Sequence, residues 1–220
     1  MSEQAHVEHA APVPTPRRTR GELHVFALPN LLTYSRILAV PVLVVCFYIE
    51  GNAIRWLSFA VFLLATLSDF LDGYLARAWR QQSAIGRILD PIADKILVAT
   101  ALLLLVWEGT IGSWSLLAAI IILTREIAVA GLREFLRELS VPLPVSRLAK
   151  WKTTLQMIAI GILLIGKAGD QLLKVYFNDT LGLVTYVGLL LLWVSALITV
   201  YTGYDYFRAG IRHLMEDEAP

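Results

Sequence analysis

The chain alternates between apolar runs of about twenty residues and short polar segments. Hydrophobic residues occupy 57% of the 220 positions. An apolar run of about 20 residues is long enough to cross the hydrocarbon core of a bilayer as an α-helix. The pattern predicts an all-α integral membrane protein with six transmembrane helices, at about 31–49, 53–77, 87–107, 114–137, 151–168 and 181–206.

The segments outside these spans differ in character. Residues 1–20 are rich in Ala, Pro and Thr and end in a basic cluster, which predicts a disordered tail near anionic headgroups. Residues 21–29 mix apolar and polar side chains, and we expect a short interfacial helix there. Residues 21–210 then form one six-helix membrane domain, and residues 211–220 form a second tail.

The distribution of charge predicts the orientation. With six spans, both termini and the connections at 78–86 and 138–150 share one side of the membrane. Of the 19 Lys and Arg residues, only Arg55, Lys167 and Lys174 lie away from that side. Because Lys and Arg accumulate in cytoplasmic segments, both termini are predicted to be cytoplasmic. Cys46 is the only cysteine, which excludes an intrachain disulfide and argues against metal–thiolate chemistry.

Four aspartates lie inside the second and third predicted spans: Asp69, Asp72, Asp90 and Asp94. One carboxylate at the centre of a bilayer costs roughly 2.5–3.5 kcal/mol. Four without partners would cost about 10 kcal/mol, which is comparable to the net stability of a whole domain. The aspartates must therefore meet cations.

Their spacing brings them together with small residues. On a helix that advances about 100° per residue, Asp69 and Asp72 share a stripe with Gly73 and Ala76. In the next helix, residues 86, 90 and 94 (Gly, Asp and Asp) follow at intervals of four. Carboxylates from two helices suit Mg²⁺ or Mn²⁺, and the small residues leave room for a bulky ligand.

A basic residue completes this pattern. Arg77 follows Gly73 by about one turn and can meet phosphate oxygens in a bidentate manner. Two metal ions with a basic rim are suited to displacement at phosphorus. Two alternatives stay open: structural ion pairs with nearby cations, and a proton or ion pathway. Structural ion pairs would not require glycines on the same stripe as the carboxylates. The cations in reach are Arg77, Arg87, Lys95 and Arg125.

The run Asp69-x2-Asp72-Gly73-x2-Ala76-Arg77-x8-Gly86-x3-Asp90-x3-Asp94 resembles the signature of the CDP-alcohol phosphatidyltransferases at every defined position. The resemblance implies a six-helix membrane enzyme with two divalent cations, which transfers a phosphatidyl group from a CDP-activated donor to an alcohol and releases CMP. It implies that the four aspartates hold the metals, with Asp94 also as general base. The implied donor-binding residues are Asn30, Thr33, Arg36, Asp69, Gly73, Ala76, Arg77 and Gly86. Arg36 could equally snorkel to the interface.

Three further stretches, 29–36, 124–134 and 150–156, are similar to the branch of this family that joins CDP-diacylglycerol to sn-glycerol 3-phosphate. Ala149 stands where a glycine is expected. The likeness runs from about 28 to about 200, and it also implies a homodimer in the inner membrane of a bacterium. We expect membrane lipid, but no nucleic acid, as a partner.

A physical argument from charge also supports glycerol 3-phosphate as the acceptor. Glycerol 3-phosphate is a dianion, so its site needs cations beyond those that balance the aspartates. The residues expected to hold its phosphate are Arg125, Arg133, Ser146, Arg147, Lys150 and Lys152. Arg133, Arg147 and Lys152 are equally explained by the positive-inside rule. The alternatives within the family are phosphatidylglycerol, as in cardiolipin synthesis, or an inositol phosphate. The alternative of another class is a carboxylate-based transporter.

Overall fold

The computed structural model describes residues 28–79, 84–138, 147–177 and 182–217. These residues form six helices and no strand. They are α1 (Leu28–Tyr48), α2 (Asn52–Trp79), α3 (Ala84–Trp107), α4 (Ser115–Glu138), α5 (Arg147–Phe177) and α6 (Leu183–Asp217). The six predicted helices and the all-α class are confirmed. The predicted tail at 1–20 and most of the predicted interfacial helix lie outside the described residues.

Several helices are longer than the apolar runs that predicted them. α5 has 31 residues and α6 has 35, and α6 continues to Asp217, into the segment expected to be a tail. An apolar run marks only the part of a helix that lies in the hydrocarbon, for which about 20 residues suffice. Helical hydrogen bonding continues beyond it, so hydropathy cannot locate the helix ends.

Within the described residues, four helices are long and apolar enough to cross a membrane, with spans at Leu31–Tyr48, Ser115–Arg137, Leu148–Lys174 and Leu183–Arg208. In α2 the apolar part is shorter, Asn52–Ser68, and it ends where the aspartates begin. Many large apolar side chains lie on the outside of the bundle, including Leu64, Ile127 and Leu197, each about two-thirds exposed. An apolar exterior is what a lipid environment requires, so the protein is a multi-pass membrane protein.

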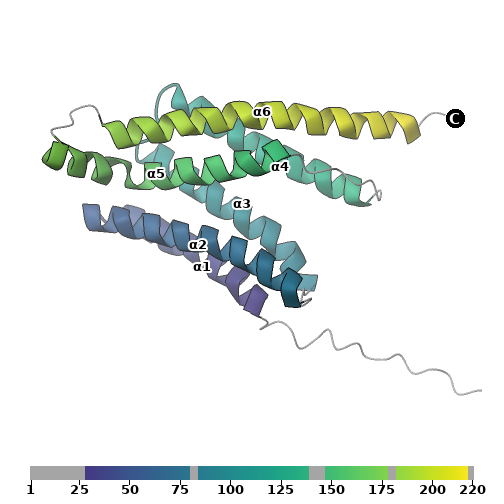
Figure 1. Cartoon of the computed structure of the whole chain (residues 1–220), viewed down its shortest axis with the longest axis horizontal. Helices are drawn as coiled ribbons and strands as arrows, with labels where there is room; N and C mark the ends of the chain where they lie inside the picture. Colours follow the sequence, from purple (N-terminus) through teal and green to yellow (C-terminus); the bar gives the residue numbers. More distant parts are fainter. Residues whose placement is uncertain (1–27, 80–83, 139–146, 178–181, 218–220) are drawn as a thin grey trace, which may run out of the picture.

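The helices form two groups that spread apart toward one end (Figure 1). α1 packs on α2 and α3, α6 packs on α4 and α5, and α5 joins the groups through α2. We call the end where α1, α3 and α5 begin the site end, and the opposite end the far end. Fully buried Leu97, Leu102, Ile122 and Leu163 fill the core where the groups meet.

α5 and α6 form the closest helix pair. A Cβ atom at Gly188 of α6 would lie 2.8 Å from the Leu163 side chain of α5, so only glycine allows this approach. The Asp170 carboxylate of α5 accepts a hydrogen bond of 2.7 Å from the backbone N–H of Val184, in the first turn of α6. This cap fixes the start of α6 on α5, and thereby the register in which the rest of α6 faces the bundle.

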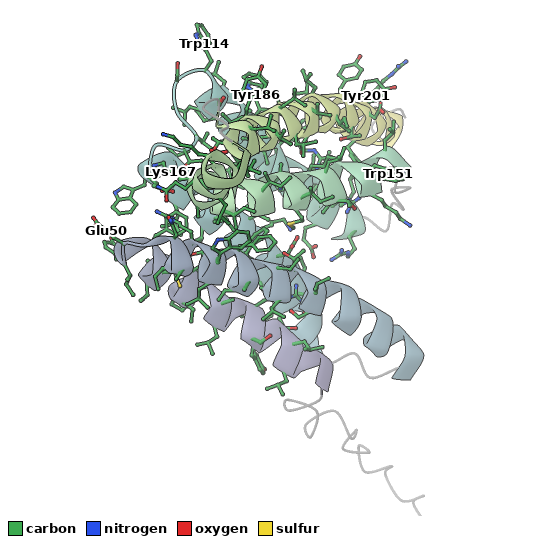
Figure 2. All side chains as sticks on the ribbon, turned by 60° about the vertical axis from the view of Figure 1, so that its left-hand side comes forward. Glu50, Trp114, Trp151, Lys167, Tyr186 and Tyr201 are labelled. Carbon is green, nitrogen blue, oxygen red and sulfur yellow. The ribbon has the colours of Figure 1, made fainter. Side chains whose placement is uncertain are left out.

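At the far end, Glu108 links three helices. Its carboxylate lies 2.7 Å from Arg55 of α2 and 3.3 Å from Lys167 of α5. Glu108 directly follows α3, and its side chain is only 14% exposed, as part of this cluster. Figure 2 shows Lys167 at the same end as Glu50 and Trp114. The cluster holds the two groups together at the end away from the spread helices.

Replacing Glu108 with glutamine should weaken this link without touching the site end. A hydrogen bond to a charged group contributes about 1.5–3 kcal/mol. We expect the apparent Tm in detergent to fall by about 5 °C, with the activity per folded molecule unchanged. The matched control is Glu50→Gln, which removes an exposed carboxylate at the same end. An equal Tm for both variants would contradict a structural role for Glu108.

Candidate active site

A cavity of about 1480 Å³ lies at the site end, between α2, α3, α4, α5 and α6. One part of its wall is apolar and comes from α2 and α5, with residues such as Phe59, Phe62 and Met157. Another part is charged and comes from α3, α4 and the start of α5. Pockets for single small ligands usually measure about 300–1,000 Å³, so this cavity has room for more than one reactant. Its combination of walls suits an amphiphile together with a polar partner.

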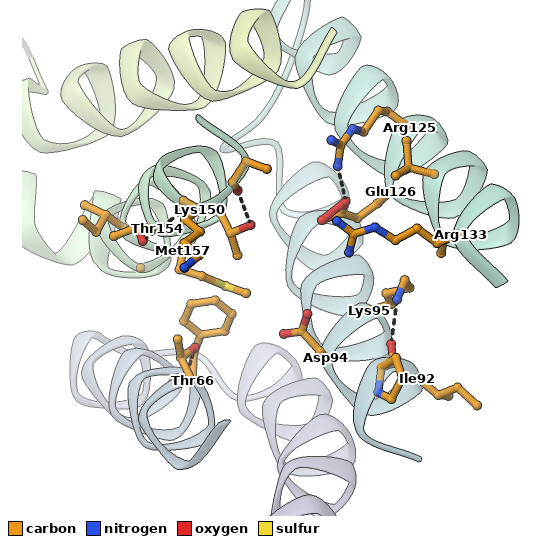
Figure 3. Close-up of a pocket in the computed structure, with 18 of the residues that line it drawn as sticks. Thr66, Ile92, Asp94, Lys95, Arg125, Glu126, Arg133, Lys150, Thr154 and Met157 are labelled. Atoms are coloured by element: carbon orange, nitrogen blue, oxygen red, sulfur yellow. Dashed lines mark hydrogen bonds and ion pairs between the residues drawn. The ribbon is translucent and has the colours of Figure 1, made fainter. Parts of the chain in front are cut away.

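Asp94 projects into this cavity from α3 (Figure 3). It shares this stretch of α3 with Asp90, one helical turn earlier, and with Pro91 between them. Lys95 donates a hydrogen bond of 2.9 Å to the Pro91 carbonyl oxygen of its own helix. Asp94 is therefore the acidic side chain that α3 presents to the cavity in the described part of the chain.

Asp90 is held by two buried side chains of α1. The Thr33 hydroxyl donates a hydrogen bond to Asp90 Oδ1, and Arg36 Nη2 lies 3.8 Å from the same oxygen. Thr33 and Arg36 are 1% and 0% exposed. Both contacts reach one carboxylate oxygen, so α1 orients this carboxylate. The structure thus brings Thr33 and Arg36 of the 29–36 stretch to Asp90, and the role of this stretch in binding the CDP donor stays a prediction.

The remaining donor-side residues are placed only by their backbone. Asp69, Asp72, Gly73, Ala76 and Arg77 lie on α2, and Gly86 lies near the start of α3. Their side chains, and that of Asn30, lie outside the described part of the structure. Among the side chains that the structure describes, no group of three or more His, Cys, Asp or Glu could hold a metal ion. The four-carboxylate metal site therefore stays a prediction.

The charged wall on α4 is organised around Glu126. Its carboxylate accepts hydrogen bonds from Arg125 Nη1 at 3.0 Å and from Lys152 Nζ at 2.8 and 2.9 Å. Lys152 is 1% exposed and is not among the residues that line the cavity. Its predicted contact with the acceptor phosphate stays a prediction, but the structure gives its ammonium group a different partner.

Three of the predicted acceptor-binding residues do line the cavity: Arg125, Arg133 and Lys150. Figure 3 shows Arg125 and Arg133 on α4 and Lys150 on α5, on different sides of the cavity. Arg147 begins α5 with its side chain undescribed, and Ser146 lies outside the described residues. The structure therefore gathers cations from two helices around one space that Asp94 also faces.

Sequence reasoning missed two residues of this site. Glu126 could have been found, because a carboxylate inside an apolar span is itself a signal of a buried partner. The Tyr-rich stretch 201–206 at the end of the sixth span predicts an aromatic belt that would include Tyr206. Tyr206 is instead 5% exposed and lines the cavity, whereas Tyr201 and Tyr204 are 59% and 65% exposed, as a belt requires.

The family model described as CDP-alcohol phosphatidyltransferase matches residues 26–201. The chain belongs to the CDP-alcohol phosphatidyltransferase family. This confirms the resemblance that the aspartate signature carried, and it identifies the protein as an enzyme of that class. The matched residues include both predicted aspartate helices and almost all the residues that line the cavity.

Curated members of the CDP-alcohol phosphatidyltransferase family are similar over most of this chain. A protein of Cereibacter sphaeroides is 38% identical over 88% of this chain and 99% of its own length. One of Rickettsia bellii is 42% identical over 83% of this chain and 94% of its own length. One of Haemophilus influenzae is 34% identical over 87% of this chain and 97% of its own length. All three are named CDP-diacylglycerol–glycerol-3-phosphate 3-phosphatidyltransferase.

Proposed function

We propose that the protein transfers the phosphatidyl group of CDP-diacylglycerol to sn-glycerol 3-phosphate, giving phosphatidylglycerophosphate and CMP. The observation that carries the proposal is one cavity in which the Asp94 carboxylate faces arginines of α4 and a lysine of α5, beside an apolar wall. The names of the three bacterial relatives support the same two substrates.

The apolar wall suits the lipid part of the donor. Phe59, Phe62 and Leu63 of α2 face Met157 and Ile158 of α5 across this part of the cavity. Acyl chains placed here lie between two membrane helices, so they can continue into the surrounding bilayer without crossing a polar surface. The diphosphate end of the donor then lies toward α3 and its aspartates.

The charged wall suits an anionic acceptor. Arg125, Arg133 and Lys150 line the cavity, and the exposed pair of Arg137 with Glu134, at 2.6 Å, adds no net charge. Glu126 offsets only one of the two cations that it bonds, Arg125 and Lys152. Lys95 also lines the cavity, so cations outnumber carboxylates in its lining. A phosphate dianion binds favourably to such a group, whereas a neutral alcohol would leave it without a counter-charge.

In the proposed reaction, Asp94 takes the proton of the acceptor's 1-hydroxyl. The oxygen forms a bond to the phosphorus that carries the diacylglycerol, and the bond from that phosphorus to the bridging oxygen breaks. CMP leaves with the electron pair of that bond. Carboxylate oxygens are the donors that hard divalent cations prefer, and Asp69, Asp72, Asp90 and Asp94 would hold Mg²⁺ or Mn²⁺. When bound, such cations neutralise the charge of the diphosphate.

We further propose that the site end faces the cytoplasm across the inner membrane of a bacterium. The connection between α2 and α3 and the basic start of α5 belong to this end, as the positive-inside rule requires. Trp151 and Tyr201 lie toward it and are exposed, as expected for side chains at a membrane interface (Figure 2). The homodimer that the family resemblance implies stays part of this proposal.

The test is CMP release by the purified full chain in detergent, with CDP-diacylglycerol, Mg²⁺ or Mn²⁺, and one acceptor at a time. We expect release with glycerol 3-phosphate and its loss when a chelator removes the metal. Release only with phosphatidylglycerol or an inositol phosphate would keep the family and overturn the acceptor. No release with any acceptor would overturn the proposed function.

A further inference from the structure

The two arginines of the charged wall rest on one tyrosine of another helix. Arg133 Nη2 donates a hydrogen bond of 2.8 Å to the Tyr206 hydroxyl. The guanidinium carbon of Arg133 lies 5.0 Å from the centre of the Tyr206 ring, and that of Arg125 lies 5.8 Å from it. Both distances are within the range of cation–π attraction. A single ring, 5% exposed, thus contacts both cations.

The neighbouring residues of α6 complete a seat for Arg125. The Thr202 hydroxyl accepts a hydrogen bond of 3.0 Å from Arg125 Nη2 and itself donates one of 2.9 Å to the Ile198 carbonyl oxygen. A Cβ atom at Gly203 would lie 3.2 Å from Arg125 Cγ, so the absent side chain lets the arginine stem lie against α6. Thr202, Gly203 and Tyr206 therefore form one surface, which we call the α6 seat.

The α6 seat contacts two arginines that lie far apart along α4. Arg125 and Arg133 are eight residues apart, so their Cα atoms are separated by about 12 Å along the axis of α4. Their side chains leave that axis in directions about 80° apart. Two long side chains with this separation do not converge on one small anion by themselves, and their like charges repel. Contact with one aromatic ring places both guanidinium carbons within 5.8 Å of the ring centre and offsets part of the repulsion.

We infer that Tyr206 is a positioning residue that fixes Arg125 and Arg133 as a clamp for the phosphate of the acceptor. The inference rests on the proposed function and deepens it, because it names the element that makes the site selective for a phosphomonoester dianion. The clamp is organised before the acceptor binds, so less side-chain freedom is lost on binding. Tyr206 acts through the arginines and takes no part in the chemical step.

Tyr206→Phe separates the hydroxyl contact from the ring. Initial rates of CMP release are measured against glycerol 3-phosphate and, separately, against CDP-diacylglycerol. We expect the KM for glycerol 3-phosphate to rise about 3–10-fold, which is the range for loss of one typical intramolecular hydrogen bond, because Tyr206 acts on the phosphate only through the arginines. The KM for CDP-diacylglycerol and kcat should stay within about twofold, because neither depends on the acceptor clamp. Tyr206→Leu, which also removes the ring, should raise the KM for the acceptor further.

Two tyrosines of the same helix provide matched controls. Tyr201→Phe and Tyr204→Phe remove hydroxyl groups from exposed side chains, and their kinetics should match the wild type. An unchanged KM for glycerol 3-phosphate in Tyr206→Phe would overturn the inference. An equal rise in both KM values would also overturn it, because it would indicate a general loss of structure. Absence of wild-type activity with glycerol 3-phosphate would instead reject the proposed function, and the inference with it.

Discussion

Asp94→Asn is expected to lower kcat by at least about 10³-fold while the protein stays folded. The carboxylate faces the cavity from α3, and asparagine has the same shape but cannot take the proton of the attacking hydroxyl. The substitution also removes one negative charge from the predicted set of metal ligands. The measurement is the initial rate of CMP release at saturating glycerol 3-phosphate and CDP-diacylglycerol, with the apparent Tm measured in parallel.

The control for this variant is Asp205→Asn. Asp205 is exposed on α6, next to the tyrosine of the α6 seat in sequence but outside the cavity lining. Its activity should stay within about twofold of the wild type, since exposed substitutions usually have small effects. If Asp94→Asn kept more than about a tenth of the wild-type rate, the proposed role as general base would be wrong.

Glu126→Gln is expected to cause the largest loss of stability. Lys152 is 1% exposed, and both of its hydrogen bonds at 2.8 and 2.9 Å go to the Glu126 carboxylate. Removing one partner of a buried ion pair leaves the other charge uncompensated, which costs about 3–5 kcal/mol. The apparent Tm in detergent should therefore fall by about 6–20 °C.

Two further variants test this explanation. The double variant Glu126→Gln, Lys152→Met removes both charges and should recover much of the lost stability, because no uncompensated charge remains. Glu134→Gln breaks the pair with Arg137, whose side chains are 62% and 69% exposed, and should change stability by less than about 1 kcal/mol. A similar Tm for Glu126→Gln and Glu134→Gln would refute the importance of burial.

The number of helices could be predicted from the sequence, because an apolar run separated from its neighbours by polar residues marks each of them. The helix ends could not, and α6 exceeds its predicted span by 11 residues at its C-terminal end. Part of the site was also within reach. The positions of Arg125, Arg133 and Lys150 indicated a shared cationic wall, and all three line the cavity. Local spacing put Asp90 and Asp94 on one stripe of α3, but of these two only Asp94 lines the cavity, because Asp90 turns to α1.

The contacts that organise this wall were out of reach because they join distant parts of the chain. Lys152 meets Glu126 across 26 residues, and Tyr206 meets Arg133 across 73. No periodicity of one helix predicts which neighbour it will face. The prediction that Tyr206 belongs to the aromatic belt could have been avoided, however. Tyr204 and Tyr206 are two residues apart, so they point about 160° away from each other and cannot both face the membrane interface.

The contact between α1 and α3 has a consequence for biosynthesis. α1, which carries Arg36, leaves the ribosome before α3, which carries its partner Asp90. A charged side chain within the hydrocarbon costs roughly 2.5–3.5 kcal/mol, so each of these two helices inserts more favourably in the presence of the other. Insertion of α3 is thereby coupled to α1 remaining beside the insertion site. We therefore expect α1 to insert less favourably in a nascent chain that stops after α2, because such a chain carries Arg36 without Asp90.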